Sequence, residues 1–182
     1  MSEVVVQDYD PTWPRVFERL RSAVWPAVSD IAVGIEHVGS TSVPGLAAKP
    51  VVDIDVIVTE SGVAIGIERL TTLGYTHRGD LGVTGREAFA RPPGTPRHHL
   101  YLCVAGGTAL ANHLAIRDHL RANAGVAAAY GALKKRLARE FPDDIGGYIE
   151  AKTGFLAGIL REAGFDEDTI AGIERLNAKR RT

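Results

Sequence analysis

The chain has 182 residues, of which 45% are hydrophobic and 24% charged, a composition typical of a folded globular protein and unlike a fibre or an unstructured tail. Its 21 lysines and arginines balance 22 acidic residues, and the formal net charge of -1 excludes a protein that coats nucleic acid through bulk positive charge. With Cys103 as its single cysteine, the chain can form neither an internal disulfide nor a cysteine-based zinc cluster. We expect one domain over residues 1–182, in a reducing compartment.

The amino-terminal residues do not have the features of an export signal. Residues 1–8 lack both a basic segment and a long apolar segment. The purely apolar runs elsewhere are only a few residues long, whereas a membrane-spanning helix needs about 20. The sequence therefore predicts a cytoplasmic protein that does not cross a membrane.

The first part of the chain alternates predicted strands and helices. Val4 to Val6 could begin a strand, and Asp10-Pro11 has the form of a helix start. The helix that follows carries an apolar stripe with helical spacing, and Pro26 should discourage its continuation. That stripe comprises Trp13, Phe17, Leu20 and Val24. Beyond it we expect strands over 31–38 and 51–58, and then a helix from Ser61 that ends at Gly74.

The second part changes from strands to helices. Residues 75–104 have an antiparallel pattern, with strands near 86–91 and 97–104 on either side of a proline-rich loop. Four helices are predicted after Gly107, near 108–122, 126–141, 144–163 and 167–179. The order predicts an α+β fold with a helical C-terminal layer over about 107–182.

Two carboxylates stand two residues apart in the strand over 51–58. Alternation along a strand places Asp53 and Asp55 on one face, while Val52 and Ile54 pack on the other. Like charges side by side are unfavourable unless a cation lies between them or one of them is protonated, and oxygen ligands suit Mg²⁺ or Mn²⁺. The alternative is a strand with a solvated face, on which aspartate is disfavoured.

A glycine and a serine follow the preceding strand. Backbone N–H groups and the hydroxyl of Gly39-Ser40 can bind phosphate oxygens. The segment is not a Walker A loop, because Lys49 is preceded by Ala48 and followed by Pro50. Together with the two aspartates, it describes the phosphate and metal geometry of nucleotidyl transfer.

Residues 86–121 are locally basic. Five arginines and two acids give this segment a formal charge of +3. His113, Arg117 and Arg121 share one face of a predicted helix and could receive a triphosphate or an acidic acceptor, although a solvated face is the commoner outcome of this spacing. Lys49, Lys134 and Lys152 are weaker phosphate candidates.

The block from His37 to Val56 resembles the GrpB family, and the resemblance continues through Arg97 to Leu100 and Arg117 to Arg121. GrpB-like proteins in turn resemble the polymerase-β-type nucleotidyltransferases, whose hallmark is Gly-Ser followed by two acids with one residue between them. The resemblance implies a small mixed β-sheet flanked by helices. It also implies transfer of a nucleoside monophosphate from an NTP.

That superfamily usually adds a third carboxylate on a neighbouring strand, yet residues 97–104 contain no acid. His99 shares a face with the other odd-numbered residues of this strand and could complete the site as a metal ligand or general base. Glu87 is the other candidate. Alternatively, His98 and His99 end a loop and form only local hydrogen bonds.

The leading hypothesis is a Mg²⁺- or Mn²⁺-dependent nucleotidyltransferase with catalytic and metal-binding residues Asp53, Asp55 and His99. Its phosphate-binding residues would be Gly39, Ser40, Lys49, Arg97 and Arg117. The partners would be an NTP and an unidentified acceptor, without a membrane and with no indication of nucleic acid. One alternative is a nucleotide- or metal-binding module without turnover. The other is a metal-dependent phosphohydrolase that uses the aspartates with His98, His99 or His113.

Overall fold

The structure, a computed structural model, describes residues 3–178. It divides into two compact units that are interleaved in sequence. The sheet unit contains Pro11–Ser42 and Val51–Leu114, and the helical unit contains residues 3–10, 43–50 and 115–178. That the whole chain is one domain stays a prediction. In this part of the chain the division between the two units falls after Leu114 rather than at residue 107, and the helical unit also includes two earlier segments.

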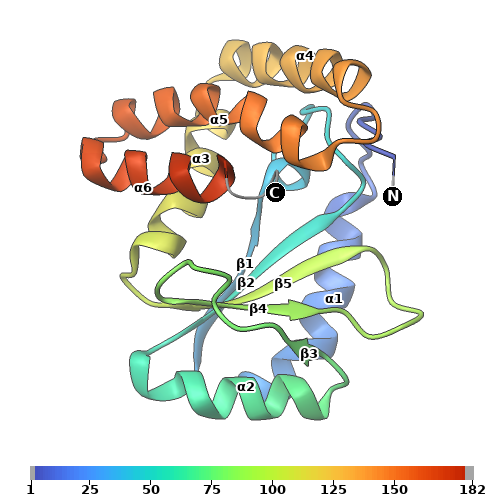
Figure 1. Ribbon diagram of the computed structural model, residues 1–182. Helices are drawn as coiled ribbons and strands as arrows, with labels where there is room; N and C mark the ends of the chain where they lie inside the picture. Colours follow the sequence, from blue (N-terminus) through green and yellow to red (C-terminus); the bar gives the residue numbers. More distant parts are fainter. Residues whose placement is uncertain (1–2, 179–182) are drawn as a thin grey trace. The chain divides into compact units, whose positions relative to one another are not determined.

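The sheet unit is built on a five-stranded mixed sheet in the order β1-β2-β5-β4-β3 (Figure 1). The middle pair, β2 and β5, is parallel, and the other neighbouring pairs are antiparallel. The strands are β1 (Ala32–Val38), β2 (Val52–Val58), β3 (Thr76–His77), β4 (Arg86–Ala90) and β5 (His98–Val104). The predicted α+β class and mixed sheet are confirmed.

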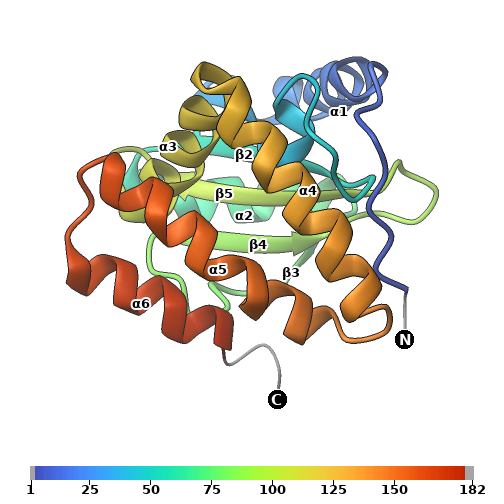
Figure 2. The same cartoon turned by 90° about the horizontal axis from the view of Figure 1, so that it is seen from above.

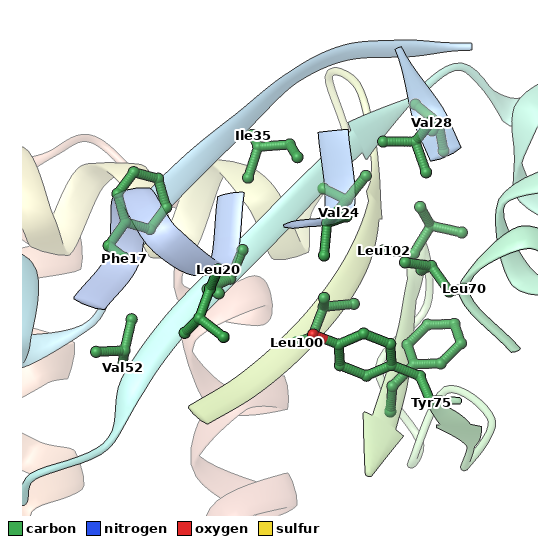
Figure 3. Close-up of a cluster of buried hydrophobic side chains, with 14 residues drawn as sticks. Phe17, Leu20, Val24, Val28, Ile35, Val52, Leu70, Tyr75, Leu100 and Leu102 are labelled. Atoms are coloured by element: carbon green, nitrogen blue, oxygen red, sulfur yellow. The ribbon is translucent and has the colours of Figure 1, made fainter. Parts of the chain in front are cut away.

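Helices α1 (Trp13–Val28) and α2 (Val63–Thr72) contribute to the core on one face of this sheet (Figure 3). The apolar stripe of α1 is buried as predicted, and three of its members, Phe17, Leu20 and Val24, pack with strand residues such as Ile54 and Leu100. Burying each such side chain stabilises the fold by roughly 1.5–3 kcal/mol.

The predicted ends of the first helix were less accurate. The helix begins at Trp13, two residues after Pro11, with Thr12 as its N-cap residue. It also continues two residues past Pro26. The expected strand at Val4 is wrong, because residues 3–6 form no strand and only Gln7 makes an isolated bridge, with Ala48.

The helical unit contains most of the C-terminal helices. These are α3 (Thr108–Ala122), which begins in the sheet unit, α4 (Ala124–Glu140), α5 (Ile145–Glu162) and α6 (Glu167–Ala178). Within the helical unit α5 contacts both α4 and α6, and Figure 2 shows it between them. Among residues 3–178, no helix combines the length and the apolarity needed to cross a membrane.

Candidate functional site

The two aspartates of β2 lie on the face of the sheet opposite the core formed with α1 and α2. Val52 and Ile54 belong to that core, so the alternate residues Asp53 and Asp55 point the other way. On the parallel neighbour β5, Asp53 is in register with His99 and Asp55 with Tyr101. Asp53, Asp55, His99 and Tyr101 therefore share one surface of the sheet.

Asp55 is the most unusual group on this surface. Its side chain has 0% exposed area, and Oδ2 accepts a hydrogen bond from Nδ1 of His113, on α3, at 2.7 Å. The other oxygen, Oδ1, is buried with no hydrogen-bond partner among residues 3–178. A buried carboxylate with an unpaired oxygen is costly unless a cation approaches it. This orphaned oxygen therefore fits a divalent metal ion.

Asp53 and His99 form a second carboxylate–imidazole pair. Nδ1 of His99 donates to Oδ1 of Asp53 at 2.8 Å. Asp53 is 27% exposed and His99 51% exposed, so both can be reached from solvent. The structure thus brings together the three residues that the sequence proposed for catalysis, Asp53, Asp55 and His99, and their roles stay predictions.

The Gly39-Ser40 loop lies against Asp53. Gly39 has a φ of +67°, and a Cβ atom built there would be 2.2 Å from Oδ2 of Asp53. The loop leads into a short 3-10 helix, η1 (Ser40–Ser42), and Oγ of Ser42 donates to the Gly39 carbonyl at 2.6 Å. Only glycine allows the backbone both this conformation and this close approach to the carboxylate.

Substituting Gly39 tests that arrangement. Gly39→Ala should lower the free energy of unfolding by about 1–3 kcal/mol, because alanine is strained in the left-handed conformation and its Cβ must displace Asp53. It should also weaken Mn²⁺ binding. The matched control is Gly94→Ala, since Gly94 has a φ of +78° with no atom within 4 Å of the built Cβ. Denaturant titration of both variants separates the crowding at Asp53 from the cost of the left-handed conformation. Equal losses of stability in the two variants would show that this crowding has no effect.

A third carboxylate, which the sequence analysis did not identify, lies beside Asp55. Glu36 on β1 is paired directly with Asp55 across the antiparallel register. Directly opposed residues of such strands project to the same face, with Cβ atoms about 4.5–5.5 Å apart. The alternation of Ile35 and Glu36 in the predicted strand could have suggested this face, but only the register identifies the partner.

Asp55 also belongs to a second, mixed set of possible metal ligands. Asp55, Cys103 and His113 each offer a ligand atom, and these atoms lie within 4.8 Å of one another. Such a set would suit Zn²⁺ if the cysteine were a thiolate. However, burial and the nearby charge of Asp55 raise the pKa of Cys103, so its sulfur is a neutral thiol and a weak ligand. The carboxylate oxygens are the better ligands here.

His98 and Glu87 lie on the opposite face of the sheet from Asp55. Nδ1 of His98 donates to the Pro96 carbonyl at 2.7 Å, and Nε2 accepts from the Tyr75 hydroxyl at 2.9 Å. Glu87 is paired with Leu102, a core residue, and its Oε2 is 2.6 Å from Nε2 of His77. Neither residue is therefore placed beside the two aspartates.

His98 should make stability depend on pH. Burial lowers the pKa of His98 despite the hydrogen bond to Pro96. Because the unfolded state binds this proton near pH ~6.5 and the folded state only at lower pH, the contribution of His98 is complete above ~6.5 and falls below it. His98→Gln should reduce the slope of unfolding free energy with pH below ~6.5 by up to ~1.4 kcal/mol per unit. Denaturant titrations at pH 5–7, with His77→Gln as control, measure this, and an unchanged slope would contradict it.

The remaining predicted phosphate ligands fall in different parts of the chain. Arg97 is exposed immediately before β5, in the sheet unit. Lys49 and Arg117 belong to the helical unit. There, Nζ of Lys49 lies 5.7 Å from the ring centroid of Tyr148, and Nε of Arg117 donates to Asp118 at 2.7 Å. Phosphate binding by these three residues stays a prediction.

Comparison with solved structures defines the class of fold. A crystal structure of the Cid1 poly(U) polymerase with MgGTP bound superimposes with a TM-score of 0.52 at 15% sequence identity, over 74% of this chain and 44% of that chain. At this identity the similarity concerns the fold alone. The fold is of the nucleotidyltransferase type, as the sequence resemblance implied.

The chain belongs to the GrpB family, whose model, described as GrpB protein, matches residues 3–162. The crystal structure of GrpB from Enterococcus faecalis has a TM-score of 0.79 and 37% identity, over 87% of this chain and 96% of that one. The glutamate-rich protein GrpB of Alkalihalophilus pseudofirmus is 32% identical over 166 residues, 88% of this chain and 95% of that protein. The protein YqkA of Bacillus subtilis is 36% identical over 149 residues, and this match spans 79% of this chain but only 42% of YqkA.

Proposed function

We propose that the protein is a Mg²⁺- or Mn²⁺-dependent nucleotidyltransferase that transfers a nucleoside monophosphate from an NTP to an acceptor. The observation that carries this proposal is the buried, unpartnered oxygen of Asp55, beside a second aspartate against which the Gly39-Ser40 loop lies. Membership of the GrpB family and the nucleotidyltransferase-type fold support the proposal.

Asp53, Asp55 and Glu36 are the residues that would hold the cation. All three offer oxygen atoms, which Mg²⁺ and Mn²⁺ prefer. When bound, the cation supplies neutralisation of the charge on the phosphates and on the departing pyrophosphate. The Gly39-Ser40 loop would bind the β- and γ-phosphates through its backbone N–H groups and the Ser40 hydroxyl.

His99 is placed to accept a proton. In the proposed reaction an acceptor hydroxyl oxygen bonds to the α-phosphorus as the bond from that phosphorus to the bridging oxygen breaks, and pyrophosphate leaves. The hydroxyl proton passes to Nε2 of neutral His99, while Asp53 accepts from Nδ1–H and holds the ring in that tautomer.

A second candidate function is a binding module without turnover. The observation that favours it is the absence of a carboxylate among the residues of β5 that share the face of the two aspartates. These are His99, Tyr101 and Cys103. In this case the cation and nucleotide bind, but no product forms.

Calorimetry tests the binding that both candidates require. Wild-type protein should bind Mn²⁺ and then α,β-methylene-ATP, an analogue that resists cleavage at the α-phosphorus. Asp55→Asn should strongly weaken both events. The matched control is Glu68→Gln, which removes an exposed carboxylate from α2 in the same unit. Equal affinities of wild type and Asp55→Asn would overturn the proposal, and release of inorganic phosphate from ATP would indicate the phosphohydrolase.

A further inference from the structure

Arg86 is a buried cation on the same face as the two aspartates. It is the first residue of β4 and is paired with Cys103 of β5, whose side chain lies on that face. Only 6% of Arg86 is exposed, and its guanidinium carbon lies 4.5 Å from the ring centroid of Tyr101. The guanidinium therefore lies over the residue that is in register with Asp55.

Two nitrogens of this guanidinium are unsatisfied. Nε and Nη2 of Arg86 are buried without a hydrogen-bond partner among residues 3–178. Burying an unpaired charge is unfavourable, and stacking on one aromatic ring compensates only part of that cost. An anion at these nitrogens would remove the penalty.

The unsatisfied atoms define the shape of the missing partner. Nε and Nη2 form one edge of a guanidinium, and they are the edge that binds two oxygens side by side. Arg161 of this chain shows that geometry, because its Nε and Nη2 donate to the two carboxylate oxygens of Glu167 at 2.7 and 3.0 Å. A carboxylate or a phosphate group fits the free edge of Arg86 in the same way.

Arg86 lies on the far side of the aspartates from the proposed phosphate loop. Gly39 follows Val38, which is paired with Asp53, whereas Arg86 is in register with Cys103 and hence with Ile57 of β2. Four residues along a strand span about 13 Å, and β4 lies two strand spacings, about 10 Å, from β2 because β5 runs between them. A triphosphate at Gly39 therefore leaves the Arg86 edge for another molecule.

We infer that Arg86 binds a carboxylate or phosphate group of the acceptor, so that the acceptor of the nucleotide is itself an anionic molecule. This inference rests on the proposed function. The anion binding itself does not, because it can be measured without a nucleotide.

The probes are inorganic phosphate and acetate, each titrated alone and followed through the side-chain Nε–H signal of Arg86 by NMR. At least one should shift that signal to saturation, and the two arms distinguish a phosphate from a carboxylate. Arg86→Met should weaken the affinity for the anion that shifts the signal at least tenfold. Arg86→Lys keeps the charge but cannot donate two parallel hydrogen bonds, and it should weaken the affinity less. The matched control is Arg91→Met, an exposed arginine that donates to the Thr95 carbonyl.

Thermal unfolding without ligand provides a second readout. If Arg86 is held unpaired for a ligand, Arg86→Met should unfold at a higher temperature than wild type, whereas a structural arginine would give a lower one. The titration is then repeated with α,β-methylene-ATP and Mg²⁺ at saturation. An anion response that persists supports an acceptor site, and one that disappears assigns Arg86 to the phosphates of the NTP and overturns the inference.

The two proposals fail in different ways. If neither anion shifts the Arg86 signal, or if Arg86→Met binds the anion like wild type, the inference is wrong even when the NTP analogue binds. If the analogue does not bind but the anion response depends on Arg86, the anion site stands and the nucleotidyltransferase proposal fails.

Discussion

Asp55→Asn should weaken Mn²⁺ binding at least ~100-fold, more than the loss expected for a residue that only supports a metal ligand. The apo protein should be no less stable than wild type, because the substitution removes a fully buried charge whose Oδ1 has no hydrogen-bond partner among residues 3–178. Asparagine keeps the side-chain shape, and its carbonyl oxygen can still accept from His113. Calorimetry with Mn²⁺ and denaturant titration measure the two effects.

A purely structural Asp55 would behave differently. Mn²⁺ affinity would then be the same in the variant and wild type, while the free energy of unfolding would fall with the weakened hydrogen bond to His113. Glu68→Gln should change neither quantity, since its carboxylate is exposed on α2. A free energy of unfolding that does not fall indicates a site held ready for a cation, whereas a fall indicates an ordinary buried acid.

Replacing His99 should lower the rate of nucleotidyl transfer by ~10²–10⁴, the usual effect of removing a general base. His99→Ala loses both the proton acceptor and the hydrogen bond to Asp53. His99→Gln can still donate to Asp53 but cannot take up a proton, so a rate loss in both variants assigns proton transfer to the imidazole. Single-turnover measurement with labelled NTP determines these rates.

The Mn²⁺ affinity of the same variants distinguishes a base from a ligand. We expect His99→Gln to bind Mn²⁺ like wild type, because Nδ1–H of His99 is directed at Asp53. A large loss of affinity would make His99 a metal ligand instead. His77→Gln is the matched control, since His77 is also bonded to a carboxylate, that of Glu87, but lies on β3. Wild-type turnover in His99→Gln would leave His99 with a positioning role only.

Local pattern was sufficient to predict most elements of the fold. The helical spacing of Phe17, Leu20 and Val24 and the alternation around Asp53 and Asp55 predicted a helix, a strand and a shared carboxylate face, which the structure bears out. These signals depend only on the period of a helix or a strand. The ends of a helix depend on smaller energy differences than its existence does. The helix containing Pro26 begins and ends two residues from where the prolines suggested.

The partners of Asp55 could not be predicted, because they depend on long-range register. Glu36 reaches Asp55 only through the antiparallel pairing of β1 with β2, and His113 reaches it from a helix 58 residues further along the chain. The resemblance to the nucleotidyltransferases instead implied a third acid on the neighbouring strand, which here is β5 and contains none. Local pattern gives the face of each residue, but not which strands are neighbours or how they are aligned.

Transfer of a nucleoside monophosphate is tested most directly by following the label from α-labelled NTPs. Wild-type protein, Mg²⁺, each of the four NTPs and a pool of phosphate- and carboxylate-bearing metabolites should yield a labelled acceptor and an equal amount of pyrophosphate, and Asp55→Asn should yield neither. Binding of the NTP without any labelled product or pyrophosphate, in wild type and with every acceptor pool, would contradict the account and leave a nucleotide-binding module.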